Sequence, residues 1–139
     1  MHVGVMGGTG HISTSIVRVL LAQGHAVTCV NRGLRGAVAP GARLVRGDRR
    51  ARAAFERTLQ AERCDAVIDM LCFTRADALS SLRAYRDVPH VVQCSTVCTY
   101  GLTDDGLPVT EDHPLRPITP YGQHKAAADA TVLEAYACT

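Results

Sequence analysis

Lysine is almost absent from this chain. Arginine supplies fourteen of the fifteen basic side chains, and the one lysine is Lys125. A compact ammonium does work that a planar guanidinium does less well, so the place of a lone lysine can mark chemistry. Lys125 follows Tyr121 by four residues. A coding bias toward arginine would also leave few lysines, so this spacing alone supports a functional and an incidental interpretation equally.

The chain also lacks a strong charge imbalance. Its formal net charge is +2, with 20% charged and 47% apolar residues, which excludes a polycation or a disordered tail. A chain of 139 residues is long enough to bury one core. We therefore expect a single domain over residues 1–139, with no separate substrate domain.

Metal-site and membrane signals are missing as well. No Cys-x-x-Cys pair occurs, and no histidine lies at ligand spacing beside Cys94 and Cys98, so we expect no metal site. No apolar run approaches membrane-spanning length, and residues 1–5 carry no charged lead or cleavage site, so we expect a cytoplasmic protein without membrane contact. We expect reduced, mostly buried thiols at Cys29, Cys64, Cys72, Cys94, Cys98 and Cys138.

Short apolar runs alternate with helical patterns along the chain, which predicts an α/β fold with a parallel sheet and helices on its faces. Proline and glycine recur between residues 99 and 119, which predicts a long loop. Thr119 and Pro120 suit the N-cap and first position of a last helix. The expected strands are 3–6, 26–30, 43–46, 66–70 and 90–94, and the other expected helices are 12–21, 52–62 and 76–86, the last with Leu79, Leu82 and Tyr85 on one face.

A glycine-rich loop joins the first expected strand to the first helix. It reads Gly7-Gly8-Thr9-Gly10-His11-Ile12-Ser13. Glycine permits the tight turn and lets the backbone approach a pyrophosphate, whose charge the N–H groups of the helix terminus can meet. This context predicts a dinucleotide-binding site, with Ser13 as a small residue where a third glycine is usual.

The residues that follow the second and third strands bear on cofactor choice. Asn31 and Arg32 stand where an NAD site typically has an acidic residue for the ribose 2′-hydroxyl. Arg32, with Arg35 as a second candidate, could instead meet a 2′-phosphate, so NADP(H) is favoured and NAD(H) stays possible. Asp48 is placed either to accept from the adenine amino group or as an ordinary loop aspartate. The arginines of residues 43–52 favour a solvated face over a nucleic-acid patch, because no stacking aromatics are interleaved.

Tyr121 and Lys125 lie on one face if the last helix forms, because residues i and i+4 are neighbours there. A nearby ammonium favours the ionised form of a phenol, which suits Tyr121 to proton transfer. A hydroxyl that holds the substrate oxygen should complete the site. Ser95 and Thr96 lie at the carboxyl end of the fifth strand, where ligands bind in open α/β sheets, although both could be ordinary strand-end residues.

These motifs together resemble the extended short-chain dehydrogenase/reductase family of NAD(P)-dependent epimerases and dehydratases. The shared features are the glycine loop, a Tyr100-Gly101 pair four residues after Thr96, and Tyr121-Gly122-x-x-Lys125 twenty-five residues after Thr96. Both offsets select Thr96 over Ser95. The resemblance implies a Rossmann-type, doubly wound sheet of about five strands.

The resemblance also implies a site and an activity. Hydride would pass between the nicotinamide and a carbon of a small hydroxyl or carbonyl substrate, with a nucleotide sugar as one candidate. Tyr121 would move the hydroxyl proton, Lys125 would bind the nicotinamide ribose and favour ionised Tyr121, and Thr96 would orient the substrate oxygen. The last helix would make a homodimer plausible.

Two features depart from the family pattern. Residues 69–73 replace a small, alanine-rich turn, and family members continue well beyond the last helix. The alternative is therefore a truncated module that binds NADP(H) without turnover, and a nucleic-acid binder built on residues 43–52 is a third, less favoured possibility.

Overall fold

The computed structural model describes residues 1–102 and 106–137. It separates the chain into two compact units. Residues 1–71 and 80–94 form the first, called here the sheet unit. Residues 72–79 and the described residues from 95 onward form the second, called here the helical unit.

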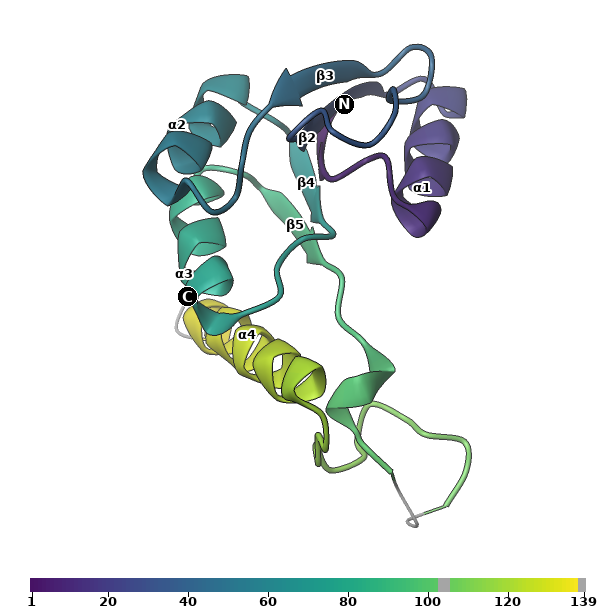
Figure 1. Ribbon diagram of the computed structural model, residues 1–139, viewed down its shortest axis with the longest axis vertical. Coiled ribbons are helices and arrows are strands. Elements are labelled where there is room, and N and C mark those ends of the chain that lie inside the picture. The colour runs from purple at the N-terminus through teal and green to yellow at the C-terminus, as the bar shows by residue number, and fades with distance from the viewer. Residues whose placement is uncertain (103–105, 138–139) are drawn as a thin grey trace. The chain divides into compact units, whose positions relative to one another are not determined.

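The sheet unit contains five parallel strands, as the sequence predicts. The strand order is β3-β2-β1-β4-β5, so the chain reverses its direction of winding between β1 and β4 (Figure 1). β1 is central, with Val3 opposite Val27 of β2 and Ala66 of β4. The strands are β1 (His2–Met6), β2 (Ala26–Asn31), β3 (Arg43–Arg46), β4 (Ala66–Asp69) and β5 (His90–Gln93).

Helices cover both faces of this sheet. α1 (His11–Ala22) lies on one face, and α2 (Arg52–Glu62) lies on the other (Figure 1). Alternation along β1 explains the two layers, because Val5 packs with Val17 of α1 while Met6 packs with Phe55 of α2. The carboxyl ends of the strands are thereby left for the loops that precede α1 and α2.

The third helix corrects one detail of the prediction. α3 is Arg75–Ala84 instead of the expected 76–86, so Tyr85 lies just beyond it, and Leu79 is 42% exposed whereas Tyr85 is buried. Ala78 and Ser81 are buried instead. Ser81 is buried because its hydroxyl donates a 2.9 Å hydrogen bond to the carboxylate of Asp69, so a polar contact and not an apolar stripe sets this part of α3.

The helical unit is built on α4 (Pro120–Ala137) and the short 3₁₀ helix η1 (Val97–Thr99). α4 begins where the sequence predicts, with Thr119 Oγ1 accepting a 3.1 Å hydrogen bond from the Gly122 amide. η1 lies at the start of the expected loop and was not predicted. A small core of this unit consists of Cys72, Ala78 and Ala128, with Val132 packed against it.

The thiol and membrane expectations can be compared with the described residues. Free thiols are buried at Cys29, Cys64 and Cys72 and more accessible at Cys94 and Cys98, whereas Cys138 lies outside the described residues. Burial raises the pKa of the Cys29 thiol to about 11. Over residues 1–102 and 106–137, the helices include none with the length and apolar character needed to cross a membrane.

Candidate cofactor and active-site residues

The glycine loop leaves β1 through two residues with positive φ. Gly7 has φ +116° and Gly8 has φ +85°, a region that side chains other than glycine rarely adopt. A Cβ atom on Gly8 would also overlap Sγ of Cys29 and lie 2.8 Å from its Cβ. Gly8 therefore allows the loop backbone to run directly against β2.

The loop ends at the N-terminus of α1. The Gly10 amide donates a 3.0 Å hydrogen bond to Oγ of the buried Ser13. The expected replacement of a third glycine is thus accommodated, because the hydroxyl satisfies a backbone donor inside the turn. Thr9 is half-buried, and His11 and Ile12 are exposed at the start of the helix. The first-turn amides of such a terminus suit a phosphate.

Asn31 supports the glycine loop from the end of β2. Its Nδ2 donates a 2.6 Å hydrogen bond to the Gly7 carbonyl oxygen, and its Oδ1 accepts a 2.7 Å hydrogen bond from the Gly33 amide. Both polar atoms of the side chain therefore bond to the backbone. This geometry makes Asn31 a residue that fixes the loop and the turn after β2.

Arg32 and Asp48 come close enough to interact electrostatically. Arg32 is exposed, and Asp48 is half-buried between β3 and α2. The pKa of Asp48 is lowered, mainly because the Arg50 amide donates a 3.0 Å hydrogen bond to Oδ1, with smaller contributions from the Arg50 side chain and, last, from the charge of Arg32. The carboxylate is thus ionised and able to accept a hydrogen bond at the carboxyl edge of the sheet.

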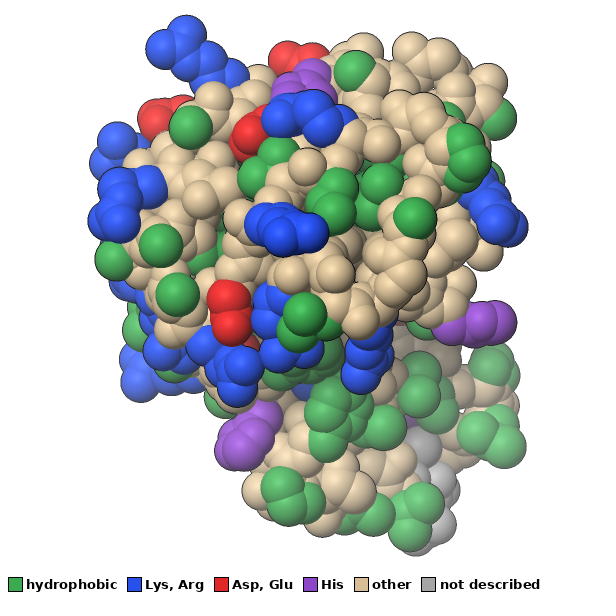
Figure 2. Space-filling model, turned by 45° about the horizontal axis from the view of Figure 1, so that its top comes forward, with side chains coloured by type: hydrophobic (Ala, Val, Ile, Leu, Met, Phe, Trp, Pro, Cys, Tyr) green, Lys and Arg blue, Asp and Glu red, His purple; other side chains and the backbone are tan. Residues whose placement is uncertain are grey.

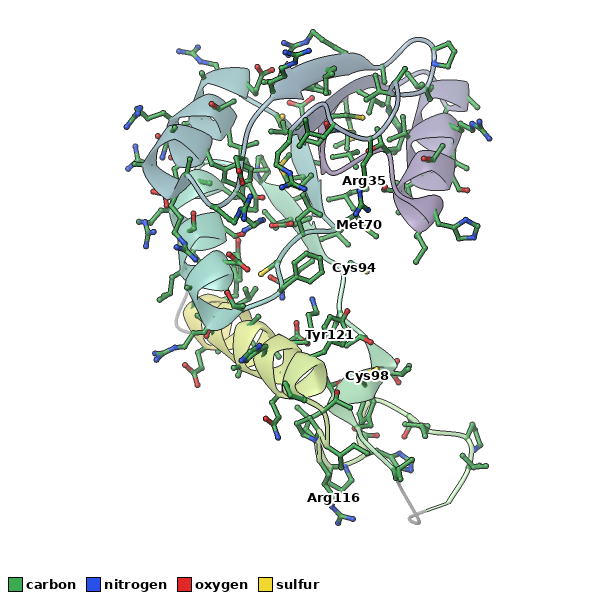
Figure 3. All side chains as sticks on the ribbon, in the orientation of Figure 1. Arg35, Met70, Cys94, Cys98, Arg116 and Tyr121 are labelled. Atoms are coloured by element: carbon green, nitrogen blue, oxygen red, sulfur yellow. The ribbon has the colours of Figure 1, made fainter. Side chains whose placement is uncertain are left out.

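The first turn of α4 packs tightly on η1 within the helical unit. A Cβ atom on the buried Gly122 would overlap the carbonyl oxygen of Cys98 and lie 3.2 Å from Cβ of Pro117. Glycine at this position lets the helix approach η1, and Figure 3 shows Tyr121 and Cys98 near this contact. Tyr121 remains 46% exposed, so its phenol is accessible.

Lys125 lies one turn further along α4 and is only 2% exposed. Its Nζ donates a 2.7 Å hydrogen bond to the backbone carbonyl oxygen of Cys72. Cys72 belongs to the segment 69–73 whose composition departs from the family pattern. The segment that differs from the family pattern is therefore also the one that supplies a hydrogen-bond acceptor to the Lys125 ammonium.

The two candidate hydroxyls have different partners. Thr96 Oγ1 accepts a 3.3 Å hydrogen bond from the Cys98 amide and so caps η1, which leaves its O–H able to donate elsewhere. The Ser95 hydroxyl instead donates to the carboxylate of Asp129 on α4. Thr96, Tyr121 and Lys125 all belong to the helical unit, with Thr96 at η1 and the other two on α4.

The arginines of residues 43–52 are largely paired. Arg43 contacts Glu62 and Arg50 lies 3.5 Å from Asp48, whereas Arg49 is buried against Asp69. The expectation of a solvated face was wrong for Arg49, because a buried carboxylate draws it inward. Figure 2 shows the basic side chains in several places with acidic and hydrophobic groups between them.

Sequence reasoning missed the parts played by Gly122, Cys72 and Arg49. Gly122 had an available signal, since glycine in the first turn of a helix lowers helix propensity and so calls for a packing reason. The Cys72 contact had none, because a backbone carbonyl is common to every residue type. Arg49 stood in a row of similar arginines, and only tertiary contacts distinguish it.

The strand order, its switch point at β1 and the glycine loop that follows β1 define a Rossmann-type α/β protein. Comparison with known proteins agrees. The family model of the NAD dependent epimerase/dehydratase family matches residues 3–137, and the chain belongs to this family.

Individual relatives include a reductase and several epimerases. The chain is 40% identical over 134 residues to 2'-dehydrokanamycin reductase of Streptomyces kanamyceticus, covering 96% of this chain and 38% of the reductase. It is 33% identical to UDP-glucose 4-epimerase of Lactobacillus helveticus, covering 90% of this chain and 44% of the epimerase. The chain thus spans less than half the length of these relatives.

Solved structures agree in fold. UDP-glucose 4-epimerase of Thermus thermophilus in complex with NAD superposes with a TM-score of 0.86 at 29% identity, over 99% of this chain and 51% of that structure. A second UDP-glucose 4-epimerase structure gives a TM-score of 0.87 at 23% identity, which supports the fold alone.

Proposed function

We propose that this chain carries the dinucleotide-binding and proton-transfer residues of a nicotinamide-dependent epimerase, dehydratase or reductase. The observation that carries the proposal is the glycine loop, where Gly8 lies so close to Cys29 that no side chain fits. Membership of the NAD dependent epimerase/dehydratase family supports it further. When bound, the nicotinamide supplies hydride exchange with a substrate carbon.

The residues of the sheet unit suit a dinucleotide. Residues 7–12 would hold the pyrophosphate at the N-terminus of α1, and the ionised Asp48 would accept from the adenine amino group. Asn31 would keep the loop in place through its 2.6 Å hydrogen bond to Gly7. These assignments use backbone amides and a carboxylate that the described fold already orients.

Two observations bear on whether the cofactor is NAD(H) or NADP(H). Arg32 and the lack of an acidic residue after β2 favour NADP(H). The related epimerase of Thermus thermophilus holds NAD, which favours NAD(H). We take NAD(H) as the better supported form. Arg32 would meet the 2′-phosphate only where NADP(H) is bound instead.

Proton transfer is assigned to the helical unit. Tyr121 is exposed enough to exchange a proton with a substrate hydroxyl, and the Thr96 O–H can donate to the same oxygen. Lys125 would hold the nicotinamide ribose and favour ionised Tyr121. Relatives named UDP-glucose 4-epimerase support a nucleotide sugar as the substrate class. A homodimer through α4 stays a prediction.

The alternative function is binding without turnover. It requires only the glycine loop and none of the proton-transfer residues. A module of this kind would bind the dinucleotide through the glycine loop and show no redox step.

The test combines binding with a single half-reaction. NADH binding is measured by fluorescence, and reduction of bound NAD by UDP-glucose is followed at the absorbance of NADH. Tyr121→Phe is expected to retain binding and slow the half-reaction by about 10²–10⁴-fold, the usual contribution of general acid–base catalysis. Tyr136→Phe is the matched control, since Tyr136 is an exposed tyrosine of the same helix.

Each outcome decides between the alternatives. Binding together with a half-reaction that Tyr121→Phe slows and Tyr136→Phe does not supports the enzyme. Binding without any half-reaction supports the non-catalytic module, and the absence of dinucleotide binding overturns both.

A further inference from the structure

A buried polar cluster joins the loop after β3 to the end of β4 and to α3. At its centre is Arg49, which is 8% exposed and forms an ion pair with Asp69. The guanidinium also donates to Ser81 Oγ at 3.0 Å and lies 4.9 Å from the centre of the Phe55 ring. One side chain thus connects three elements of the sheet unit.

Both carboxylate oxygens of Asp69 accept hydrogen bonds. Its Oδ2 accepts hydrogen bonds of 2.9 Å from the hydroxyls of Ser81 and Tyr85, besides its contact with Arg49. Its Oδ1 accepts a 2.9 Å hydrogen bond from the Leu71 amide. Burial and the neighbouring carboxylate of Asp69 raise the pKa of Tyr85, so this phenol stays protonated as a donor.

A cluster of this kind is a poor way to gain stability. The cost of removing two charges from water can exceed their attraction, and well-packed apolar side chains often serve as well or better. Buried ion pairs do fix geometry, because each partner has few alternative positions. The residue whose geometry is fixed here is the neighbour of Arg49 in the chain.

That neighbour is Asp48, which is half-buried while Arg49 is buried. Its Oδ1 accepts from the Arg50 amide at 3.0 Å, and its carbonyl oxygen accepts from the Ala51 amide at 3.0 Å. On the other side, the Gly47 amide donates a 3.0 Å hydrogen bond to the Asn31 carbonyl oxygen. The loop is therefore tied at both ends, and Arg49 anchors its middle.

We propose that Arg49 is a positioning residue, which acts through Asp69 to hold Asp48 where it accepts a hydrogen bond from the exocyclic amino group of the cofactor's adenine. This inference rests on the dinucleotide-binding function proposed above. In this role Arg49 would influence base recognition only through the loop.

The test compares two dinucleotides that differ at that amino group. Dissociation constants are measured for NAD and for nicotinamide hypoxanthine dinucleotide, in which an oxo group replaces the amino group. Because a carboxylate accepts a hydrogen bond from an amino group and not from an oxo group, the intact chain is expected to prefer NAD by several-fold. Asp48→Ala should abolish this preference.

Variants of Arg49 decide the role. Arg49→Met leaves Asp69 buried without its cation and can fail to fold, so Arg49→Met/Asp69→Asn, which removes both charges, is measured beside it. In the folded variant the preference should fall toward one, mainly through weaker NAD binding. Tyr85→Phe removes one donor to Asp69 and should give a smaller fall. Arg57→Ala is the control, since Arg57 is an exposed arginine of α2.

The outcomes separate this inference from the function on which it rests. A purely structural Arg49 would shift both dissociation constants by one factor, and an unchanged preference in a folded variant therefore overturns the inference. So does an intact chain that binds both dinucleotides equally. An intact chain that binds neither overturns the proposed function itself.

Discussion

The ammonium of Lys125 donates a 2.7 Å hydrogen bond to the backbone carbonyl oxygen of Cys72. The only lysine of the chain is thus a buried residue that joins α4 to the segment before α3 within the helical unit. Lys125 therefore makes a structural contact and also lies one turn after Tyr121 on α4. Its role toward a cofactor would be added to a contact that the fold already makes.

Burial of Lys125 predicts a pattern of chemical labelling. The chain carries two amines, the Met1 terminus and Lys125, and Met1 is exposed while Lys125 is 2% exposed. An amine-specific acylating reagent is expected to modify Met1 readily and Lys125 slowly in the folded chain, because acylation needs local opening. Peptide mass spectrometry measures both, with the urea-unfolded chain as control. Equal rates at the two amines in the folded chain would contradict the buried position.

Gly122→Ala tests the contact between α4 and η1. Alanine favours a helix over glycine by about 1 kcal/mol, so propensity alone predicts stabilisation. The new Cβ would overlap the carbonyl oxygen of Cys98, and overpacking of this kind typically costs about 1–3 kcal/mol. We expect a lower free energy of unfolding, measured by urea titration. Gln123→Ala, at an exposed site on the same turn, should be neutral or slightly stabilising, and an equal gain in both variants would disprove the contact.

Gly8→Ala tests the glycine loop. The substitution meets a φ of +85° and an overlap with Cys29. Gly24→Ala is a matched control, because Gly24 has φ +79° and nothing within 4 Å of the added Cβ. The control should show only the backbone cost of about 1–2 kcal/mol, and Gly8→Ala should lose about 1–3 kcal/mol more. Similar losses of unfolding free energy in the two variants would mean that β2 yields to the new side chain.

The sequence predicted the elements that carry strong local patterns. α2 has the expected bounds, and α4 begins at Pro120 behind a Thr119 cap, because capping residues and apolar periodicity act within a few residues. η1 escaped prediction since three residues are too short to show a period. Local sequence patterns were therefore sufficient to predict the order of strands and helices along the chain.

The candidate site was predictable where residue type carries the chemistry. Tyr121, Lys125 and the glycine loop stand out by spacing and composition. The burial of Ser81 and Arg49 did not, because both side chains bond to the buried carboxylate of Asp69. Such contacts join residues far apart in the sequence and leave no periodic trace.

Arg32 separates the two cofactor forms in solution. An arginine that meets the 2′-phosphate contributes about 1.5–3 kcal/mol, as hydrogen bonds to charged groups do. Arg32→Ala is therefore expected to weaken NADPH binding by about 10- to 150-fold and to leave NADH binding nearly unchanged, measured by fluorescence titration at one salt concentration. Arg57→Ala, at an exposed arginine of α2, controls for the loss of one positive charge. A parallel loss for both cofactors in Arg32→Ala would assign Arg32 to the shared part of the dinucleotide and remove the sequence argument for NADP(H).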